Sequence, residues 1–314
     1  MDTLTYPKRT QAEQRVPAWA LVSIIIGTML LPGMDAIAKS LKGLASVATI
    51  TLVRNVAQVG LLLPFALYRY GKAAFHIKDW YIQLVRSLCI VLCGMSFFAA
   101  VQRMPLADAL AISFVHPMIV AAFSPFILGE HLSRRQWAAV GLGFLGSLII
   151  IRPGSGIFGF SAALPLAAAL FYAGYGLATR RLATGAVPVI LLQLWSGIFS
   201  SLLIVPVMVV LVMIAGHTMA ISAFSFTVPT GQTTLALLAM ALFGTTGHLL
   251  ITRGARHVSA TLTAGLGYVE IISATALGWY FFGNFPDFWT WLGLALIIVS
   301  SIWLTRIGNT MTVT

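Results

Sequence analysis

Residues 105–152 read PLADALAISFVHPMIVAAFSPFILGEHLSRRQWAAVGLGFLGSLIIIR. A shift of 154 positions places them on residues 259–306, SATLTAGLGYVEIISATALGWYFFGNFPDFWTWLGLALIIVSSIWLTR. Gly129 then falls on Gly283, Trp137 on Trp291 and Arg152 on Arg306. The same shift places His116 on Glu270, each near the middle of an apolar run. An ionisable side chain in hydrocarbon costs about 2.5–3.5 kcal/mol, so its presence indicates a functional site by default. The chain is therefore an internal repeat with one such residue at the same depth in each half.

The composition assigns this chain to a lipid bilayer. Of its 314 residues, 59% are hydrophobic and only 9% are charged. A soluble domain of this size keeps much of its surface in water and could not hide so much apolar side chain. The net charge of +11 does not indicate a nucleic-acid partner, because the Lys and Arg residues fall between apolar runs and not on one face.

Ten apolar stretches have about the 20-residue length that crosses a bilayer as a helix. They are residues 17–38, 46–70, 80–103, 105–128, 135–152, 158–179, 187–215, 233–252, 259–282 and 288–305. The sequence therefore predicts an all-α polytopic membrane protein. Its segments are an N-terminal tail (1–16), two five-helix repeats (17–153 and 158–306) and a C-terminal tail (307–314).

The Lys and Arg residues predict the orientation. With a cytoplasmic N-terminus, thirteen of them, from Lys8 to Arg306, lie on the cytoplasmic side. The other side receives only Lys39, Lys42, Arg103 and Arg152. Both termini are thus expected in the cytoplasm. Because each half has five spans, the second half enters the membrane from the opposite side, and the repeat is inverted, as in alternating-access transporters.

The motifs of the first half resemble the first EamA domain of the drug/metabolite transporter superfamily. They run from Arg86 through a break at Arg103-Met104-Pro105, His116-Pro117 and Leu128-Gly129-Glu130 to Ile151-Arg152-Pro153-Gly154. Upstream, Lys39 and Arg54 match the first-span Lys and second-span Arg of that family. The second half matches through Tyr268, Gly283, Pro286-Asp287 and Gly293, but Asn284 stands where the family usually has Glu.

The resemblance implies a fold and a function. It implies ten helices, two cytoplasmic termini, and a central cavity lined mainly by spans one, three, four, six, eight and nine. Members of the superfamily move amino acids and derivatives, S-adenosylmethionine, riboflavin, nucleotide sugars and other small organic solutes, inward or outward.

The middle of each half contains the first candidate binding residues. Pro117 lacks an N–H, which frees the carbonyl of Ser113 four residues back and favours a kink beside His116. The matching stretch Gly265-Leu266-Gly267-Tyr268 has poor helix propensity just before Glu270. We therefore predict that His116, Ser113, Glu270 and Tyr268 bind substrate. The alternative for His116 is a hydrogen bond that only packs two helices together.

Other polar residues within the spans are further candidates. Thr245, Thr246 and His248 form a polar centre that is expected to bind substrate, although a Thr hydroxyl can also bond its own helix. Asp35 and Arg54 are expected to serve coupling or gating, with Glu270, and the alternative for these two is a structural ion pair.

Two more charged residues have structural explanations. Asp108 near the start of the fourth span is expected to cap its helix. Arg86, near the cytoplasmic end of the third span, is expected to extend its head group toward the interface.

These observations favour a secondary transporter of the inner membrane that moves a small organic metabolite, such as an amino acid or derivative or a solute like S-adenosylmethionine or riboflavin. The expected partners are that solute, the bilayer and protons as a coupling ion, with a homodimer left open. No cofactor, metal or nucleic acid is expected, since no phosphate loop, metal-ligand pair or nucleophile elbow occurs. The alternative is an intramembrane enzyme or lipid-handling protein that uses His116 and Glu270 as acid and base.

Overall fold

The computed structural model describes residues 17–77, 79–128, 133–152, 159–183, 187–215, 228–257, 266–267 and 269–310. These residues form helices and connections, without a strand among them. The first half comprises α1 (Ala18–Ser40), α2 (Val47–Tyr70), η1 (Gly71–Phe75), α3 (Trp80–Val101), α4 (Leu106–Ser113), α5 (His116–Leu128) and α6 (Arg134–Ile151). The second comprises η2 (Gly159–Ala162), α7 (Ala163–Ala183), α8 (Val189–Ala215), α10 (Gly231–Ala255), α12 (Val269–Phe282) and α13 (Phe288–Thr310).

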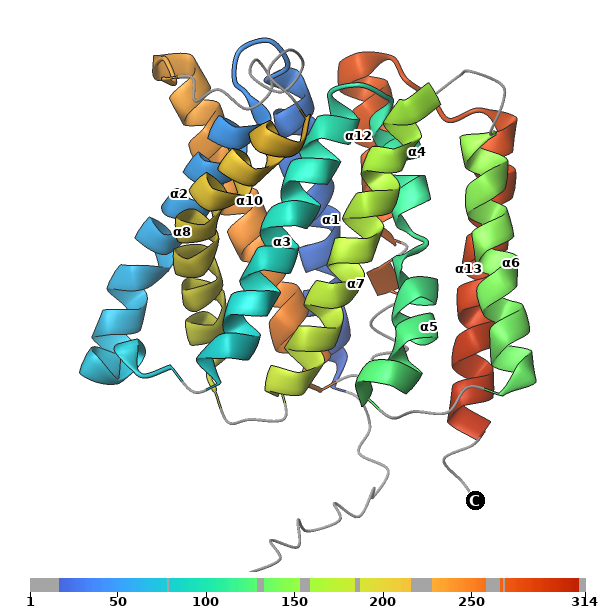
Figure 1. Ribbon diagram of the computed structural model, residues 1–314, viewed down its shortest axis with the longest axis horizontal. Coiled ribbons are helices and arrows are strands. Elements are labelled where there is room, and N and C mark those ends of the chain that lie inside the picture. Colours follow the sequence, from blue (N-terminus) through green and yellow to red (C-terminus); the bar gives the residue numbers. More distant parts are fainter. Residues whose placement is uncertain are drawn as a thin grey trace, which may run out of the picture.

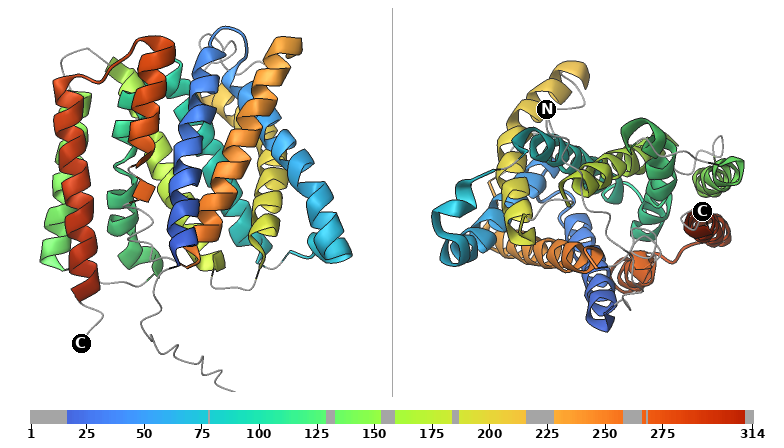
Figure 2. Two further views of the ribbon diagram at one scale, coloured as in Figure 1. Left: turned by 180° about the vertical axis from the view of Figure 1, so that it is seen from behind. Right: turned by 90° about the horizontal axis from the view of Figure 1, so that it is seen from below.

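Each of the ten predicted spans overlaps a helix, and the fourth is divided into α4 and α5. Most of the first ten residues of the ninth span (259–268) lie outside the described residues. Within the described residues, seven helical segments are long and apolar enough to cross a membrane. Two shorter apolar helical stretches are residues 269–282, which form α12, and residues 288–300 of α13. The helices run side by side, and α1 begins at the end of the bundle where α13 finishes (Figures 1 and 2).

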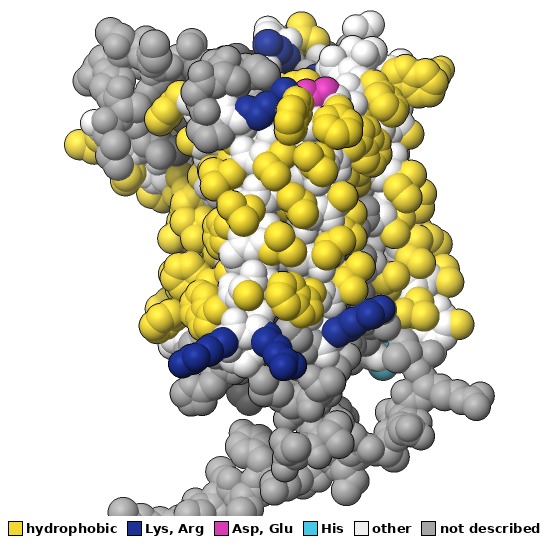
Figure 3. Space-filling model, turned by 90° about the vertical axis from the view of Figure 1, so that its right-hand side faces the viewer, with side chains coloured by type: hydrophobic (Ala, Val, Ile, Leu, Met, Phe, Trp, Pro, Cys, Tyr) yellow, Lys and Arg dark blue, Asp and Glu magenta, His cyan; other side chains and the backbone are white. Residues whose placement is uncertain are grey.

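The outer surface of the bundle is apolar. Large side chains such as Leu202, Met213 and Trp279 are exposed. On the face drawn in Figure 3, hydrophobic side chains cover the middle, and Lys and Arg side chains gather toward its two ends. A band of this kind matches a hydrocarbon layer between two polar interfaces.

The main helix pairs each take one member from either half. They include α1 with α10, α3 with α7, α2 with α8, α4 with α12, and α6 with α13. The last pair approaches closely, because a Cβ atom added to Gly146 would lie 2.6 Å from the carbonyl oxygen of Gly293, and one added to Gly293 would lie 2.5 Å from that of Gly146. Small residues at such a crossing let two membrane helices touch backbone to backbone.

A second contact joins α6 and α13. Ser300 donates its hydroxyl to the carbonyl of Ala139. The shift of 154 positions places Ala139 on Gly293 and Gly146 on Ser300. The two contacts between α6 and α13 therefore join equivalent positions of the two halves.

Candidate functional site

A cavity of about 110 Å³ lies between the helices of both halves. Residues of α1, α2, α3, α4, α5, α7, α10 and α12 line it. Its polar and ionisable lining residues are Asp35, Arg54, Cys93, Ser113, His116, Tyr172, His248 and Glu270. Six of the ionisable or hydroxyl residues selected from the sequence thus meet in one space, although they are up to 235 positions apart (Asp35 to Glu270).

The break between α4 and α5 positions His116. Helix α4 ends at Ser113 and α5 begins at His116. As predicted, the carbonyl of Ser113 is available, and it lies 3.1 Å from Nδ1 of His116. Because a carbonyl can only accept, Nδ1 carries the proton and Nε2 is left as an acceptor. The hydroxyl of Ser113 bonds the carbonyls of Ala109 (2.9 Å) and Pro165 (3.2 Å), which ties α4 to α7.

Glu270 occupies the corresponding place in the second half. It is the second residue of α12, so its carboxyl lies in the first turn, where the helix dipole favours a negative charge. Ser273 bonds the backbone carbonyl of Glu270 at 3.0 Å, and the residue lines the cavity. Tyr268, the predicted neighbour, lies outside the described residues.

Asp35 and Arg54 line the cavity without pairing. Both are buried, with exposed fractions of 3% and 4%. Among the described residues, no ion pair joins them, so the structural ion pair is wrong. Arg54 instead donates through Nη2 to Asn55 Oδ1 at 3.0 Å, and Nη1 lies 4.0 Å from the sulfur of Met34. Asp35 Oδ1 and Arg54 Nε have no hydrogen-bond partner. A buried polar atom without a hydrogen-bond partner carries a free-energy cost.

The three polar residues predicted on α10 do not all line the cavity. His248 lines the cavity, and the lining does not include Thr245 or Thr246. Thr245 is buried and its hydroxyl has no hydrogen-bond partner, whereas Thr246 is half-buried. The close contact of Gly247 with the backbone of Gly27 fixes which face of α10 points to α1.

An aromatic series connects two of the cavity residues. The ring of His116 meets that of Tyr172 edge-on at 4.9 Å between centroids. Tyr172 stacks on Tyr175 at 5.7 Å, and Tyr175 meets His248 at 6.4 Å. The series therefore joins the broken helix of the first half to α10 through α7.

Arg86 contacts this aromatic series at Tyr175. Its predicted extension to the interface is wrong, because the side chain is fully buried. It donates to the hydroxyls of Tyr175 (2.6 Å) and Thr179 (2.8 Å) and to the carbonyl of Leu192 (3.1 Å). The guanidinium also lies 4.5 Å from the centre of the Tyr175 ring. The sequence contains a signal for this buried position, because Gln83, Arg86 and Ser87 form a polar stripe on one face of α3.

Asp108 also departs from its prediction. Helix α4 has no side-chain cap, and Asp108 Oδ1 instead accepts from the hydroxyl of Thr290 at 2.8 Å. In the part of the chain that the structure describes, no three His, Cys, Asp or Glu residues are grouped to hold a metal ion.

Curated relatives cover most of the chain. The pseudopaline exporter CntI of Pseudomonas aeruginosa is 28% identical over 284 residues, which are 90% of this chain and 94% of that protein. The riboflavin transporter of Rhizobium johnstonii is 29% identical over 78% of this chain and 76% of its own. The S-adenosylmethionine uptake transporter of Rickettsia prowazekii is 23% identical over 78% of both.

A solved crystal structure of a protein shares the fold, with a TM-score of 0.61 and 19% sequence identity, over 92% of this chain and 98% of that one. The model of the EamA-like transporter family matches residues 17–152 and 159–306. Together with the apolar helices, these matches make the protein a multi-pass membrane protein. The chain belongs to the EamA-like transporter family.

Proposed function

We propose that this chain is a secondary transporter that carries a small organic solute across the cell inner membrane by alternating access. One observation carries the proposal: both halves wall a central cavity in which Asp35, Arg54 and Glu270 lie together, and Asp35 and Arg54 are not paired with one another. Ionisable groups buried in a membrane protein mark a substrate or ion pathway.

The helix pairs support two inverted repeats, residues 17–153 and 158–306. If α1 to α3 correspond to α7, α8 and α10, the pair α1 with α10 corresponds to the pair α7 with α3. The pairs α2 with α8 and α6 with α13 correspond to themselves. A pseudo-two-fold axis between the repeats would produce this exchange of pairs. The charge bias favours a cytoplasmic start for the first repeat and a cytoplasmic end for the second, which supports an axis in the membrane plane.

The charges of the cavity favour a solute that bears both a positive and a negative group. Asp35 and Glu270 supply carboxylates for a cationic group, and Arg54 supplies a guanidinium that suits a carboxylate or phosphate. The perpendicular rings of His116 and Tyr172 add aromatic surface against which an aromatic or heterocyclic part can pack. The three relatives are named for pseudopaline, riboflavin and S-adenosylmethionine.

Glu270 is the proposed coupling residue. A carboxyl in a cavity that opens to the two sides in turn can bind a proton on one side and release it on the other. The family match favours a transporter over the alternative of an intramembrane enzyme.

The test uses purified protein in proteoliposomes. Riboflavin, S-adenosylmethionine and the common amino acids are first screened for thermal stabilisation, and flux of the best stabiliser is then measured at an acidic and a neutral pH. We expect Glu270→Gln to abolish flux or its pH dependence, and His116→Ala to weaken binding. Asp79→Asn is the matched control, because Asp79 is exposed with a left-handed backbone (φ 54°) that Asn tolerates. Wild-type flux with an unchanged pH dependence in Glu270→Gln would refute the coupling role.

A further inference from the structure

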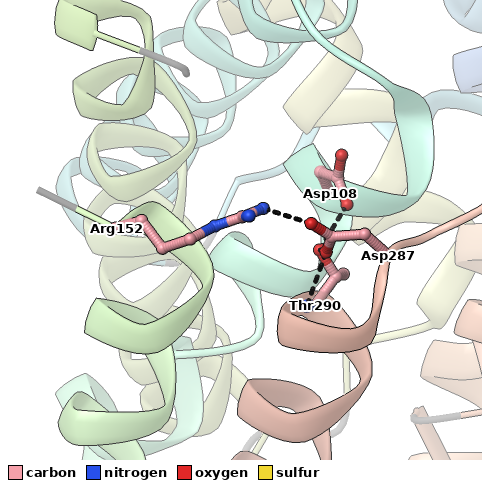
Figure 4. A network of polar contacts seen from close by, with 4 residues as sticks. All are labelled: Asp108, Arg152, Asp287 and Thr290. Atoms are coloured by element: carbon pink, nitrogen blue, oxygen red, sulfur yellow. Dashed lines mark hydrogen bonds and ion pairs between the residues drawn. The ribbon is translucent and has the colours of Figure 1, made fainter. Parts of the chain in front are cut away.

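A second polar network lies away from the cavity, where α4 begins, α6 ends and α13 begins (Figure 4). Arg152 Nη2 pairs with Asp287 Oδ2 at 2.6 Å. The hydroxyl of Thr290 lies 2.8 Å from Asp287 Oδ1 and 2.8 Å from Asp108 Oδ1. The backbone N–H of Thr290 also donates to Asp287 Oδ1, which caps α13. One hydroxyl thus bridges two carboxyl groups, and one of these groups is held by an arginine.

The network joins the two halves of the chain. Asp108 and Arg152 come from the first half, and Asp287 and Thr290 come from the second. Asp108 and Thr290 are buried, while Arg152 and Asp287 have side chains that are 21% and 46% exposed. Arg152 caps α6 in a left-handed conformation (φ 49°) that favours glycine, and from there its side chain reaches Asp287. The network therefore links α4, α6 and α13 at one end of the bundle, across the boundary between the repeats.

Among the described residues, the equivalent positions at the opposite end do not form this network. The shift of 154 positions places Ser133 on Asp287 and Gln136 on Thr290. These two residues form a capping box on their own helix, with Ser133 N donating to Gln136 Oε1 at 2.8 Å and Gln136 N donating to Ser133 Oγ at 3.3 Å. The shift also places Asp108 on Leu262, which has no charge. Within the part of the chain that the structure describes, the repeat thus supplies a helix cap at both ends, whereas the two carboxyl groups and the paired arginine lie at the same end.

We infer that Asp108, Arg152, Asp287 and Thr290 form a one-sided latch, which holds this end closed and must open before the cavity can be reached from it. The inference rests on the proposed alternating access. In the proposed orientation the latch lies at the outer face. It biases the protein toward the state that is open to the cytoplasm.

The test uses a native thiol as the reporter. Cys93 lines the cavity, and Cys89, which does not, is replaced by Ser. A charged, membrane-impermeant quaternary-ammonium methanethiosulfonate is added to right-side-out and to inverted vesicles, and the rate of Cys93 modification is measured from each side. Asp287→Asn keeps a good helix cap but removes the charge. Arg152→Gln removes the other charge, and Arg306→Gln is the matched control at the equivalent position of the second half.

We expect Asp287→Asn and Arg152→Gln each to raise outer modification about fivefold, the factor that corresponds to a surface ion pair of about 1 kcal/mol. Inner modification should fall in both, and Arg306→Gln should match the parent protein. If the parent is modified from both sides but the latch variants raise both rates alike, or change neither, the latch is refuted and alternating access stands. If Cys93 in the parent is reached from one side only, and this holds in every variant, alternating access fails and the latch fails with it.

Discussion

Replacing Tyr175 with Phe removes one acceptor from the buried guanidinium of Arg86 and leaves the aromatic ring in place. The hydroxyl accepts from Arg86 Nη2 at 2.6 Å, whereas the contact of the guanidinium with the ring, at 4.5 Å, survives the change. A hydrogen bond to a charged group contributes about 1.5–3 kcal/mol, and here no water can replace the lost oxygen because Arg86 is fully buried. We therefore expect Tyr175→Phe to destabilise the protein by about 1.5–3 kcal/mol.

The assay is thermal unfolding in detergent, followed by the fraction of protein that stays monodisperse. With about 2 °C per kcal/mol for a chain of this size, the apparent Tm should fall by about 3–6 °C. The control is Tyr68→Phe, which makes the same chemical change on a side chain that is 89% exposed and should shift the Tm by less than about 1 °C.

A double-mutant cycle separates the hydrogen bond from general packing. In an Arg86→Met background the Tyr175 hydroxyl has lost its charged donor, so Tyr175→Phe should cost less than about 0.5 kcal/mol. The reasoning is refuted if Tyr175→Phe costs the same with and without Arg86, or no more than Tyr68→Phe.

Two further predictions concern the latch and the orientation. Burial by itself raises the pKa of Asp287, but the hydrogen bonds from Thr290 and the ion pair with Arg152 outweigh it and hold the pKa below its usual range. The ion pair is therefore complete above the ordinary Asp pKa of about 3.9 and is lost only as pH falls through the lower folded value. The ratio of outer Cys93 modification between Asp287→Asn and its parent should thus stay constant between about pH 8 and pH 5, and a ratio that drops toward one in that range would contradict this. For the orientation, a reporter active only outside the cytoplasm should be silent when fused to Thr314 and active near His217, and a signal at Thr314 would exclude two cytoplasmic termini.

The break at His116 shows which features a sequence can specify locally. Pro117 has no N–H, so the free carbonyl of Ser113 follows from the covalent chain alone, and the structure contains it. The ten apolar runs likewise overlap helices, because the length of a bilayer span and the hydrogen bonding of its backbone are properties of one segment. The sequence therefore located the helices and the central polar residues His116, His248 and Glu270.

Partners across the bundle were decided by the rotation and contacts of whole helices. The charges of Asp35 and Arg54 suit an ion pair, but the guanidinium of Arg54 contacts Asn55 and Met34 instead. Asp108 bonds Thr290 across 182 positions, and Thr245 lies outside the cavity that His248, three residues later, lines. A hydropathy pattern places a side chain at a depth along its helix. Its direction and its partner depend on which neighbouring helices pack against that face, and only the tertiary structure holds that information.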